Sequence, residues 1–386
     1  MSAIKERGII AGFDVVICGG GIAGIEGLLR LRRLAGNSVR VTLVSPEDEF
    51  VYRPLAVREP FAQADARRYP LARIASDTGA SWVRDRLASV DVDARKVHTE
   101  SGDELSFDAL LLALGARESS PYEHAHVFSD HDDGQSLREI VREIELRRLK
   151  SLAFVLPNWP AWPVPLYELA LMTAERARSI GLDLQISFIT PEGRPLKAFG
   201  QAAADAILRL LAQAGINLHA GVVAQVPAPQ LVTFGETRLE VQRIVTLPRV
   251  NGPAVPGIPA GDGWFVPIDP RCLVQDTNDR VFAAGDATDF PVKHGGIGAQ
   301  QADTAAAGIA HLAGIGERPP LLEPVIRGTL LSGDRPLYLL AARVVDGLGW
   351  RSEVYEQPPW PAEEKVVAEE LGPYLKTLSA PAAPTR

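Results

Sequence analysis

A glycine-rich turn between a short apolar strand and a helix constrains this chain more than any other feature. Residues 14–18 read DVVIC, a β-branched run typical of a buried parallel strand. Residues 19–24 match the pattern G-x-G-x-x-G, and apolar residues then recur at helical spacing over residues 22–34. Residues 39–44 read as a second strand. Strand, glycine turn, helix and strand in this order predict a dinucleotide-binding Rossmann unit.

Each glycine of this turn has a predicted role. Gly19 permits the tight turn, Gly21 lets the backbone approach a pyrophosphate, and Gly24 lets the helix lie close to the strand. Ile22 and Ala23 open the helix, whose unpaired N–H groups and partial positive charge attract phosphates.

The second strand lacks the acid that usually holds the adenine-side ribose. It ends in Val44, Ser45, Pro46 and Glu47. Ser45 could hydrogen-bond one hydroxyl, and Glu47 could reach round to it. The sequence leaves this choice open.

Composition excludes several other classes of function. The chain has 386 residues, enough for two or three domains, and its net charge of −8 lacks the basic footprint of a nucleic-acid-binding protein. No signal peptide and no membrane-spanning run is predicted, so we expect a cytoplasmic location, with peripheral attachment to a membrane left open. The acidic cluster at residues 130–133, with His124 and His126, is interpreted as the cap of a charged amphipathic helix at 136–149, and no metal site is expected.

Two further apolar strands end in turns that extend the pattern. Residues 107–116 end in a Gly-Ala turn that places Ala113 and Gly115 after the strand, and residues 281–287 end with Gly285 and Asp286. With these segments the sequence resembles the FAD/NAD(P)-dependent oxidoreductases of glutathione-reductase-like topology. Within them it is most similar to the group of sulfide:quinone oxidoreductase and the flavocytochrome c flavoprotein. The resemblance spans roughly residues 12 to 312 and implies FAD as the cofactor.

The resemblance also implies roles for residues around the flavin. Asp286 would hydrogen-bond the ribityl chain, and Gly285 would allow the backbone to approach it. The helix that opens near Gly296 and Ile297 would face the flavin pyrimidine ring, where its dipole stabilises negative charge. Lys293 would add positive charge there, or it is a solvated loop lysine. Residues 53–54, Arg53 and Pro54, would contact the isoalloxazine, unless the arginine forms a surface salt bridge.

A second α/β unit follows, with strands at residues 151–156 and 184–190 and a helix at 166–179. In relatives that use NADH its first turn carries another G-x-G-x-x-G, but here residues 157–165 contain four prolines, two tryptophans and no glycine. Proline has no N–H group, so a conventional NAD(P)H site should be badly weakened. Binding through an unorthodox geometry is the alternative.

Glu168 matches a helix position that points towards the flavin in these relatives. A buried carboxylate there could accept or deliver a proton. The alternative is a structural glutamate paired with Lys293 or an arginine. The group also uses a redox pair of cysteines, which Cys18 and Cys272 do not match, so disulfide reduction and ordinary sulfide:quinone activity are disfavoured.

The predicted fold is α/β, with two Rossmann-like domains of glutathione-reductase-like topology and a small C-terminal α+β domain. Residues 1–120 and 255–312 form the FAD domain, 121–254 a degenerate NAD(P)-binding-like domain, and 313–386 a C-terminal cap with a helix at about 362–378 and a disordered tail at 380–386. In relatives such a domain covers the flavin or forms a dimer or membrane contact, which leaves a homodimer open.

The predicted function is an FAD-dependent oxidoreductase that passes electrons from a small-molecule donor to a quinone or protein acceptor. Two alternatives remain. One is an NAD(P)H-dependent reductase of the ferredoxin reductase or type II NADH dehydrogenase kind. The other is a non-catalytic flavin-bearing sensor or binding protein.

Overall fold

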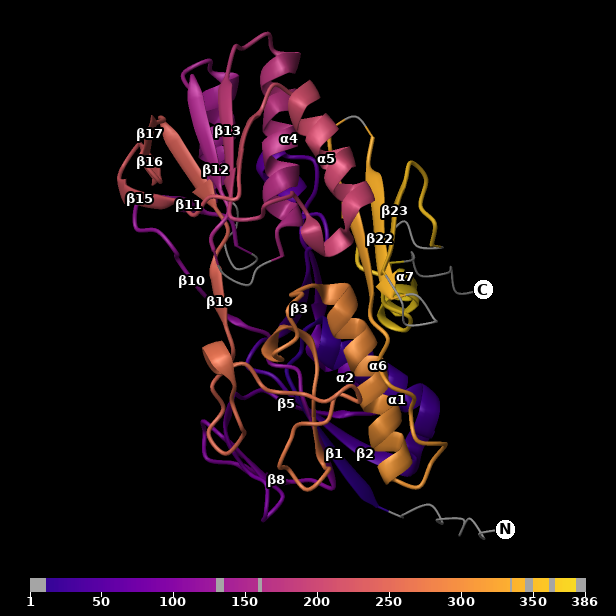
Figure 1. Cartoon of the computed structure of the whole chain (residues 1–386). Helices are drawn as coiled ribbons and strands as arrows, with labels where there is room; N and C mark the ends of the chain where they lie inside the picture. Colours follow the sequence, from indigo (N-terminus) through magenta and orange to yellow (C-terminus); the bar gives the residue numbers. More distant parts are fainter. Residues whose placement is uncertain are drawn as a thin grey trace, which may run out of the picture.

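The computed structural model describes residues 12–129, 135–158, 162–333, 335–343, 350–360 and 365–379. Two lobes, each built on a five-stranded parallel sheet, lie one above the other (Figure 1). Two crossing segments join the lobes, and they pair as the antiparallel strands β10 (Arg117–Ser119) and β19 (Arg249–Asn251).

The sheet of the first lobe carries the glycine turn. Its strand order is β20 (Val281–Ala283), β9 (Ala109–Leu112), β1 (Phe13–Cys18), β2 (Val39–Val44) and β5 (Ser81–Val83). Alternate residues of β1 point to opposite faces: Val15 and Ile17 pack with α1 (Ile22–Ala35) and α6 (Gly295–Leu312). Val16 and Cys18 pack on the other face, under the small sheet of β6 (Leu87–Asp91), β7 (Lys96–Thr99) and β8 (Glu104–Ser106).

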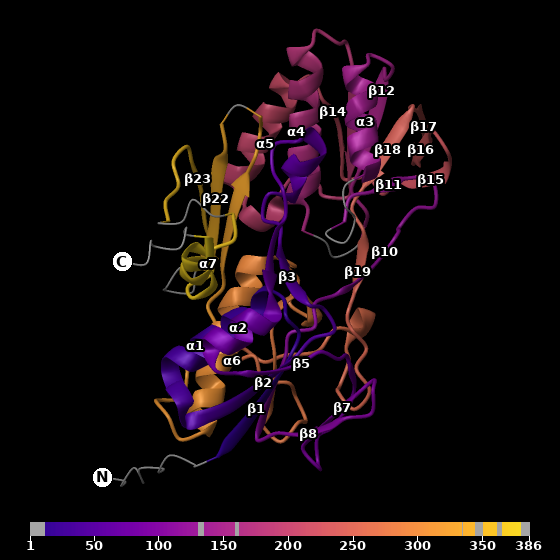
Figure 2. The same ribbon diagram turned by 180° about the vertical axis from the view of Figure 1, so that it is seen from behind.

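The second lobe repeats this arrangement. Its order is β11 (His126–Val127), β18 (Arg243–Thr246), β12 (Ser151–Val155), β13 (Gln185–Thr190) and β14 (Asn217–Ala220). One face packs against α3 (Gln135–Glu145), α4 (Val164–Ser179) and α5 (Gln201–Gln213). The other face packs against β15 (Gln225–Ala228), β16 (Leu231–Phe234) and β17 (Thr237–Glu240), on the far side of the sheet from α4 and α5 (Figures 1 and 2).

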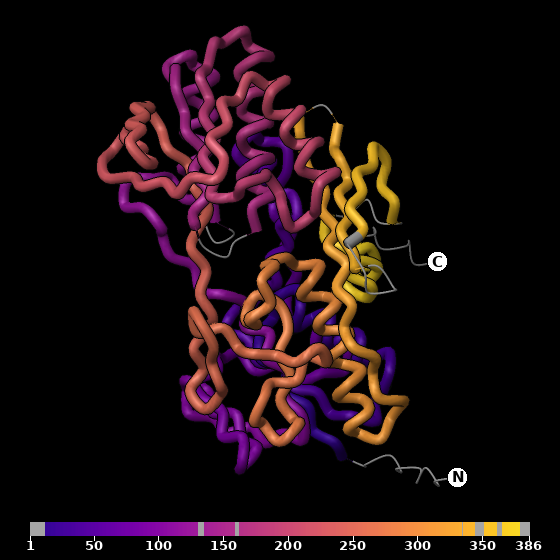
Figure 3. The backbone as a smooth tube through the Cα atoms, viewed as in Figure 1, coloured from indigo at the N-terminus to yellow at the C-terminus, as the bar shows by residue number. Residues whose placement is uncertain are grey.

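The chain leaves the first lobe and returns to it. Residues after β19 lead back to β20 and α6, which lie beside β9 and α1 (Figure 3). The predicted α/β class with two Rossmann-like cores is therefore confirmed. The segments assigned to the FAD domain share the first lobe, which is the lower one in Figure 1. The domain boundaries themselves stay a prediction.

Four short elements follow β2 in the chain and belong to the first lobe. They are β3 (Glu49–Tyr52), η2 (Ala56–Phe61), β4 (Arg67–Pro70) and α2 (Leu71–Thr78). Of these, η2 reaches the second lobe, where it contacts α3 and α4.

The C-terminal region spans both lobes. An antiparallel sheet of β21 (Val325–Leu330), β22 (Leu337–Arg343) and β23 (Trp350–Tyr355) contacts α4, α5 and α6. Residues 365–379, which we call the C-terminal strap, end in α7 (Leu371–Ser379), which packs on α1. The predicted tail at residues 380–386 lies outside the described residues.

Two predicted helix boundaries were wrong. The helix expected at about 362–378 begins only at Leu371, because Pro373 is tolerated in a first turn but would clash in the middle of a longer helix. The charged helix expected at 136–149 ends at Glu145, shortly before Arg147, whose φ of 57° is left-handed.

Candidate functional site

One large cavity opens at the carboxyl ends of the first lobe's strands and extends to the second lobe. Its volume is about 1720 Å³. Typical small-molecule sites have roughly 300–1,000 Å³. The wall includes the glycine turn at one end and Trp162, Leu247 and Pro248 of the second lobe at the other. The cavity is therefore large enough for an extended dinucleotide together with a second molecule.

The glycine turn lies against the cavity as the sequence predicts. A Cβ on Gly19 would come within 2.1 Å of the Ala113 carbonyl oxygen, and one on Gly24 within 1.8 Å of the Gly19 oxygen. Gly21 has no protein atom within 4 Å of its Cβ position and lines the cavity with Ile22 and Ala23. The bare backbone and the unpaired N–H groups of the first helical turn form a cradle that suits a pyrophosphate.

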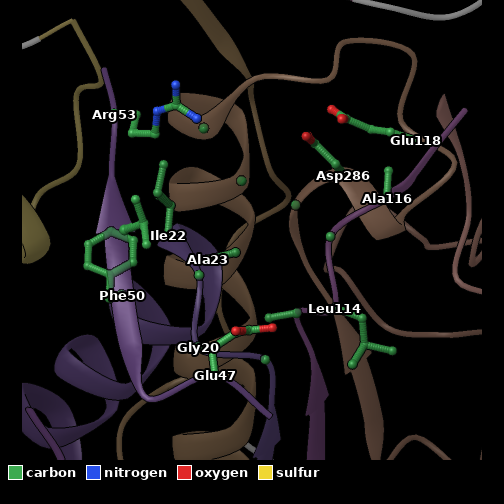
Figure 4. A pocket seen from close by; sticks show the side chains of 18 of the residues that line it. Gly20, Ile22, Ala23, Glu47, Phe50, Arg53, Leu114, Ala116, Glu118 and Asp286 are labelled. Carbon is green, nitrogen blue, oxygen red and sulfur yellow. The ribbon is translucent and has the colours of Figure 1, made fainter. Parts of the chain in front are cut away.

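The end of β2 offers Ser45 and Glu47 to the cavity. The side chain of Ser45 is buried, with Oγ 2.9 Å from the place where Gly20 would carry a Cβ. Glu47 is exposed and lies at the cavity beside Gly20 (Figure 4). Both predicted alternatives for the ribose contact therefore line the same wall.

The turn after β20 brings Gly285 and Asp286 to the opposite wall. Asp286 lies across the cavity from Arg53 in Figure 4. The Gly285 N–H donates to Oε1 of the fully buried Gln301 at 2.8 Å, which fixes the turn against α6. Ala113 and Gly115, which follow β9, line the cavity nearby.

Arg53 and Pro54 also line the cavity. Arg53 forms a two-bond ion pair with Glu59 in η2, with Nε to Oε1 at 3.0 Å and Nη2 to Oε2 at 2.7 Å. Both side chains are buried, at 10% and 6% exposure, so the pair is not the surface salt bridge considered from the sequence. Glu59 carried no sequence signal, because it belongs to no motif.

The N-terminus of α6 differs in detail from the expectation. Gly296 and Ile297 do not line the cavity, whereas His294, Gly295 and Gly298 do. The Gly296 N–H donates to Nδ1 of His294 at 3.2 Å, so this donor is already used by the protein. Burial, and then the charge of Lys365, lowers the pKa of His294 to about 4. The His294 ring is therefore neutral. It caps α6 and packs on the Trp162 ring, with the two ring centroids 4.5 Å apart.

Lys293 lines the cavity and is only 6% exposed, so it is not a solvated loop lysine. Its Nζ donates to the Thr288 carbonyl oxygen and lies 3.7 Å from the centroid of the Phe265 ring. Burial lowers the pKa of Lys293 to about 8, against the opposing effect of Asp286 and Asp289. The ammonium can therefore change protonation state in the physiological range.

Glu168 does not line the cavity. It is fully buried, accepts from the Leu331 N–H at 2.9 Å, and pairs with Lys365 at 2.5 Å. Burial raises the pKa of Glu168, and Lys365 opposes this shift. Its partner is therefore Lys365 rather than Lys293. Lys365 does line the cavity, and it was missed because it comes from the strap, 197 residues away in sequence.

The second lobe's equivalent of the glycine turn is built differently. Helix α4 has Pro163 as N-cap, without a side-chain cap, and Pro165 in its first turn. The Leu166 N–H donates to the Pro163 carbonyl oxygen at 3.1 Å. Few backbone donors therefore remain at this helix N-terminus, because Pro165 has none.

An acid does follow β13, the strand equivalent to β2, and the sequence argument overlooked it. Glu192 comes after β13, where dinucleotide-binding units carry their ribose acid. Its carboxylate accepts from the Tyr167 hydroxyl at 2.8 Å and from the Lys197 N–H at 3.3 Å. Glu192 does not line the cavity, and the protein itself occupies its hydrogen-bonding capacity.

Neither thiol is exposed to solvent, although Cys18 lies in the cavity wall. Cys18 and Cys272 are both free and fully buried. Burial raises the pKa of Cys18 to about 12 and also raises that of Cys272. Thiols of this kind are inert. Within the described residues no group of side chains suits a metal ion, and residues 130–133 lie outside them.

The described residues contain no helix with both the length and the apolar character needed to cross a membrane.

Comparisons with known proteins agree with this architecture. Residues 13–153 match the family model of the pyridine nucleotide-disulphide oxidoreductases. The sulfide-quinone reductase of Aquifex aeolicus is 24% identical over 302 residues, covering 72% of this chain and 69% of the relative. The mitochondrial sulfide:quinone oxidoreductase of Mus musculus is 24% identical over 306 residues, covering 72% of this chain and 66% of the relative.

A solved structure shows the same fold. The sulfide:quinone oxidoreductase of Aquifex aeolicus superposes with a TM-score of 0.78 at 19% sequence identity, covering 89% of this chain and 87% of that one. The cradle at Gly21 and the turn at Asp286 fit the FAD that binds such proteins. The chain is therefore homologous to the sulfide:quinone oxidoreductases and other FAD-dependent flavoproteins of the pyridine nucleotide-disulphide oxidoreductase type.

Proposed function

We propose that this protein is an FAD-dependent oxidoreductase that takes electrons from a small-molecule donor other than NAD(P)H and passes them to a quinone or a protein acceptor. The observation that carries the proposal is the contrast between the two lobes. The turn before α1 is bare backbone facing the cavity, whereas the turn before α4 has prolines where donors are needed. Each lost hydrogen bond to a charged phosphate weakens binding by about 1.5–3 kcal/mol.

The names of two relatives support a quinone as the electron acceptor. Two curated relatives are named for quinone as a substrate, and their similarity reaches across both lobes. The absence of a matching cysteine pair argues against chemistry through a thiol, since both thiols are buried in separate clusters of the core.

In this proposal FAD, when bound, supplies the two-electron carrier. Gly19, Gly21 and Ala23 would hold its pyrophosphate at the α1 N-terminus, and Asp286 would hold its ribityl chain on the opposite wall. Arg53, held in place by Glu59, and Pro54 form one side of the cavity. Trp162 and His294 close it towards the second lobe and exclude water from that side.

Two buried cations control charge and protons in the cavity. Lys293, with a pKa near 8, can donate a proton from Nζ as negative charge develops near it. Lys365 forms an ion pair with Glu168 and adds positive charge on the side of the strap. Glu168 thus acts through Lys365 and not by touching the reacting atoms.

The alternative of an NAD(P)H-dependent reductase makes a different prediction. The purified, flavin-loaded protein is mixed anaerobically with NADH, NADPH, sulfide and a quinol, and the flavin absorbance is followed by stopped flow. We expect NADH and NADPH to bleach the flavin at least about 100-fold more slowly than the productive donor. Rapid bleaching by either nicotinamide would contradict the proposal, and no reduction by any donor would favour a non-catalytic sensor.

A further inference from the structure

Two glutamates occupy equivalent positions in the two lobes, and both bind the C-terminal strap. Helix α1 starts at Ile22 and α4 at Val164, so Glu26 and Glu168 are each the fifth residue of the helix that follows the central strand of their sheet, β1 or β12. Both side chains have 0% exposure. Burying a carboxylate is costly unless it is paired or hydrogen-bonded, so each must have a specific partner.

Glu26 binds the point where the strap becomes helical. Its Oε1 accepts from the Glu370 N–H at 3.0 Å, and its Oε2 accepts from the Leu371 N–H at 2.6 Å. The carboxylate thus satisfies two of the donors that a helix N-terminus leaves unpaired and lies at the positive end of the α7 dipole. The anchor is reinforced by Leu371 and Leu375, which are buried in the core of the first lobe.

Glu168 binds the other end of the strap through Lys365, and the residues between these two anchors reach the cavity. Lys365 and Val366 line its wall. The side chain of Val366 lies 3.4 Å from the place where a Cβ of Gly295 would be, so this part of the strap packs on the N-terminus of α6. A displacement at either glutamate would therefore move atoms at the cavity wall.

We propose that Glu26 is a positioning residue for the cavity: by fixing the start of α7 it holds Lys365 against Glu168, so that two equivalent glutamates hold one strap across both lobes. The inference rests on the proposed function for the chemistry of the cavity. Its test, however, requires neither a donor nor an acceptor.

The test measures the accessibility of Lys365 in the flavin-loaded protein. Acetylation by an N-hydroxysuccinimide ester is timed and quantified by peptide mass spectrometry, with Lys96, whose side chain is 40% exposed, as internal reference. Lys365 is 11% exposed and should react slowly in the wild type. We expect Glu26→Ala to raise its rate about tenfold relative to Lys96, the order expected for loss of a cap. Glu26→Gln, which keeps the volume and one acceptor, should give a smaller rise.

Glu369→Gln is the matched control. Glu369 is the residue before Glu370, whose N–H binds Glu26, but its own side chain is 67% exposed. It makes one long ion pair, with 3.5 Å between its Oε2 and Nη1 of Arg30. In this variant Lys365 should be acetylated at the same rate, relative to Lys96, as in the wild type. Unchanged Lys365 labelling in Glu26→Ala, with faster hydrogen exchange at residues 370 and 371, would overturn the proposal, because Glu26 would then only cap α7. Should Glu26→Ala fail to fold, unchanged labelling in Glu26→Gln decides in the same way.

A second measurement separates positioning from simple structural support. The flavin midpoint potential should fall by the same amount in Glu26→Ala and in Lys365→Met, and the double variant should fall no further. Independent, additive shifts would contradict the inference. Labelling that responds to Glu26 together with rapid bleaching by NADH would refute the proposed function alone, since the strap would still be positioned as described.

Discussion

Gly21 and Gly24 belong to one motif but have different neighbours. Because the Cβ position of Gly21 is open, Gly21→Ala should change the unfolding free energy of the apoprotein by less than about 0.5 kcal/mol. It should still weaken FAD binding by about 1–3 kcal/mol, since the methyl group enters the space that the pyrophosphate needs. Gly24→Ala places a Cβ 1.8 Å from the Gly19 oxygen and should destabilise the apoprotein itself by about 3 kcal/mol. Thermal denaturation and FAD titration distinguish the two effects.

Equal losses of apoprotein stability in both variants would contradict this assignment of roles.

Lys293 should set the pH dependence of the flavin potential. Its lowered pKa means that the ammonium is present below about pH 8 and lost above it. We expect the midpoint potential to show a break near pH 8. Lys293→Met should remove the break and lower the potential at pH 7 by about 30–60 mV, the equivalent of one charge-assisted hydrogen bond. Lys293→Arg should keep the potential and remove only the break, and a break retained in Lys293→Met would assign the titration to another group.

Sequence reasoning found the site residues that belong to local motifs. Gly19, Gly21 and Asp286 line the cavity because the turns that carry them follow directly from strands, and Lys293 lines it just before α6. It missed residues whose roles depend on long-range contacts. Glu26 meets Leu371 across 345 residues of sequence, and no local pattern can reveal such a pairing.

Among the elements, α7 shows how tertiary contacts set a boundary. The apolar spacing of residues 362–378 predicted one helix, but Pro373 and the carboxylate of Glu26 favour a start at Leu371. Residues 365–370 form bends and a turn instead, and Lys365 lines the cavity. By contrast β1, α1 and β2 agree with the prediction to within one residue, because their apolar periodicity and glycine turn act locally.

The interface of α1, α6 and α7 should make stability sensitive to pH. Asp303 of α6 faces Glu26 and Arg30 of α1 and, in the strap, Glu369 and Glu370. The two strap glutamates have further partners: Arg30 and Arg33 pair with Glu370, and Arg327 of β21 interacts with Glu369. Asp77 of α2 accepts a hydrogen bond from the Tyr374 hydroxyl of α7. Burial, and then Glu26, raises the pKa of Asp303 to about 8. The native state therefore holds a proton that the unfolded chain releases near pH 4, so this group's contribution to stability falls as pH rises from about 4 to 8.

Asp303→Asn should flatten this slope. We expect its melting temperature to exceed that of the wild type by a few degrees at pH 8 and to match it near pH 4. Calorimetry across this range checks the result, with Asp205→Asn, an exposed carboxylate of α5, as control. A slope that is the same in Asp303→Asn and the wild type would place the titration elsewhere.

For the whole molecule, the two lobes are variations on one plan: a glycine turn precedes α1, and a proline-rich segment precedes α4. The strand orders are equivalent, and the helices after the central strands β1 and β12 both carry a buried glutamate as their fifth residue. Both Rossmann-like cores could be predicted because each repeats a periodic pattern. The cavity between the lobes and the strap that holds them could not, since both depend on how separate cores pack.

Calorimetric titration of the flavin-loaded protein with NADH and NADPH tests the central claim most directly. The account predicts one tightly bound FAD per chain and no saturable binding of either nicotinamide up to about 1 mM, since loss of two or more phosphate hydrogen bonds costs at least about 3 kcal/mol. Saturable, micromolar binding of NADH or NADPH at one site per chain would contradict it.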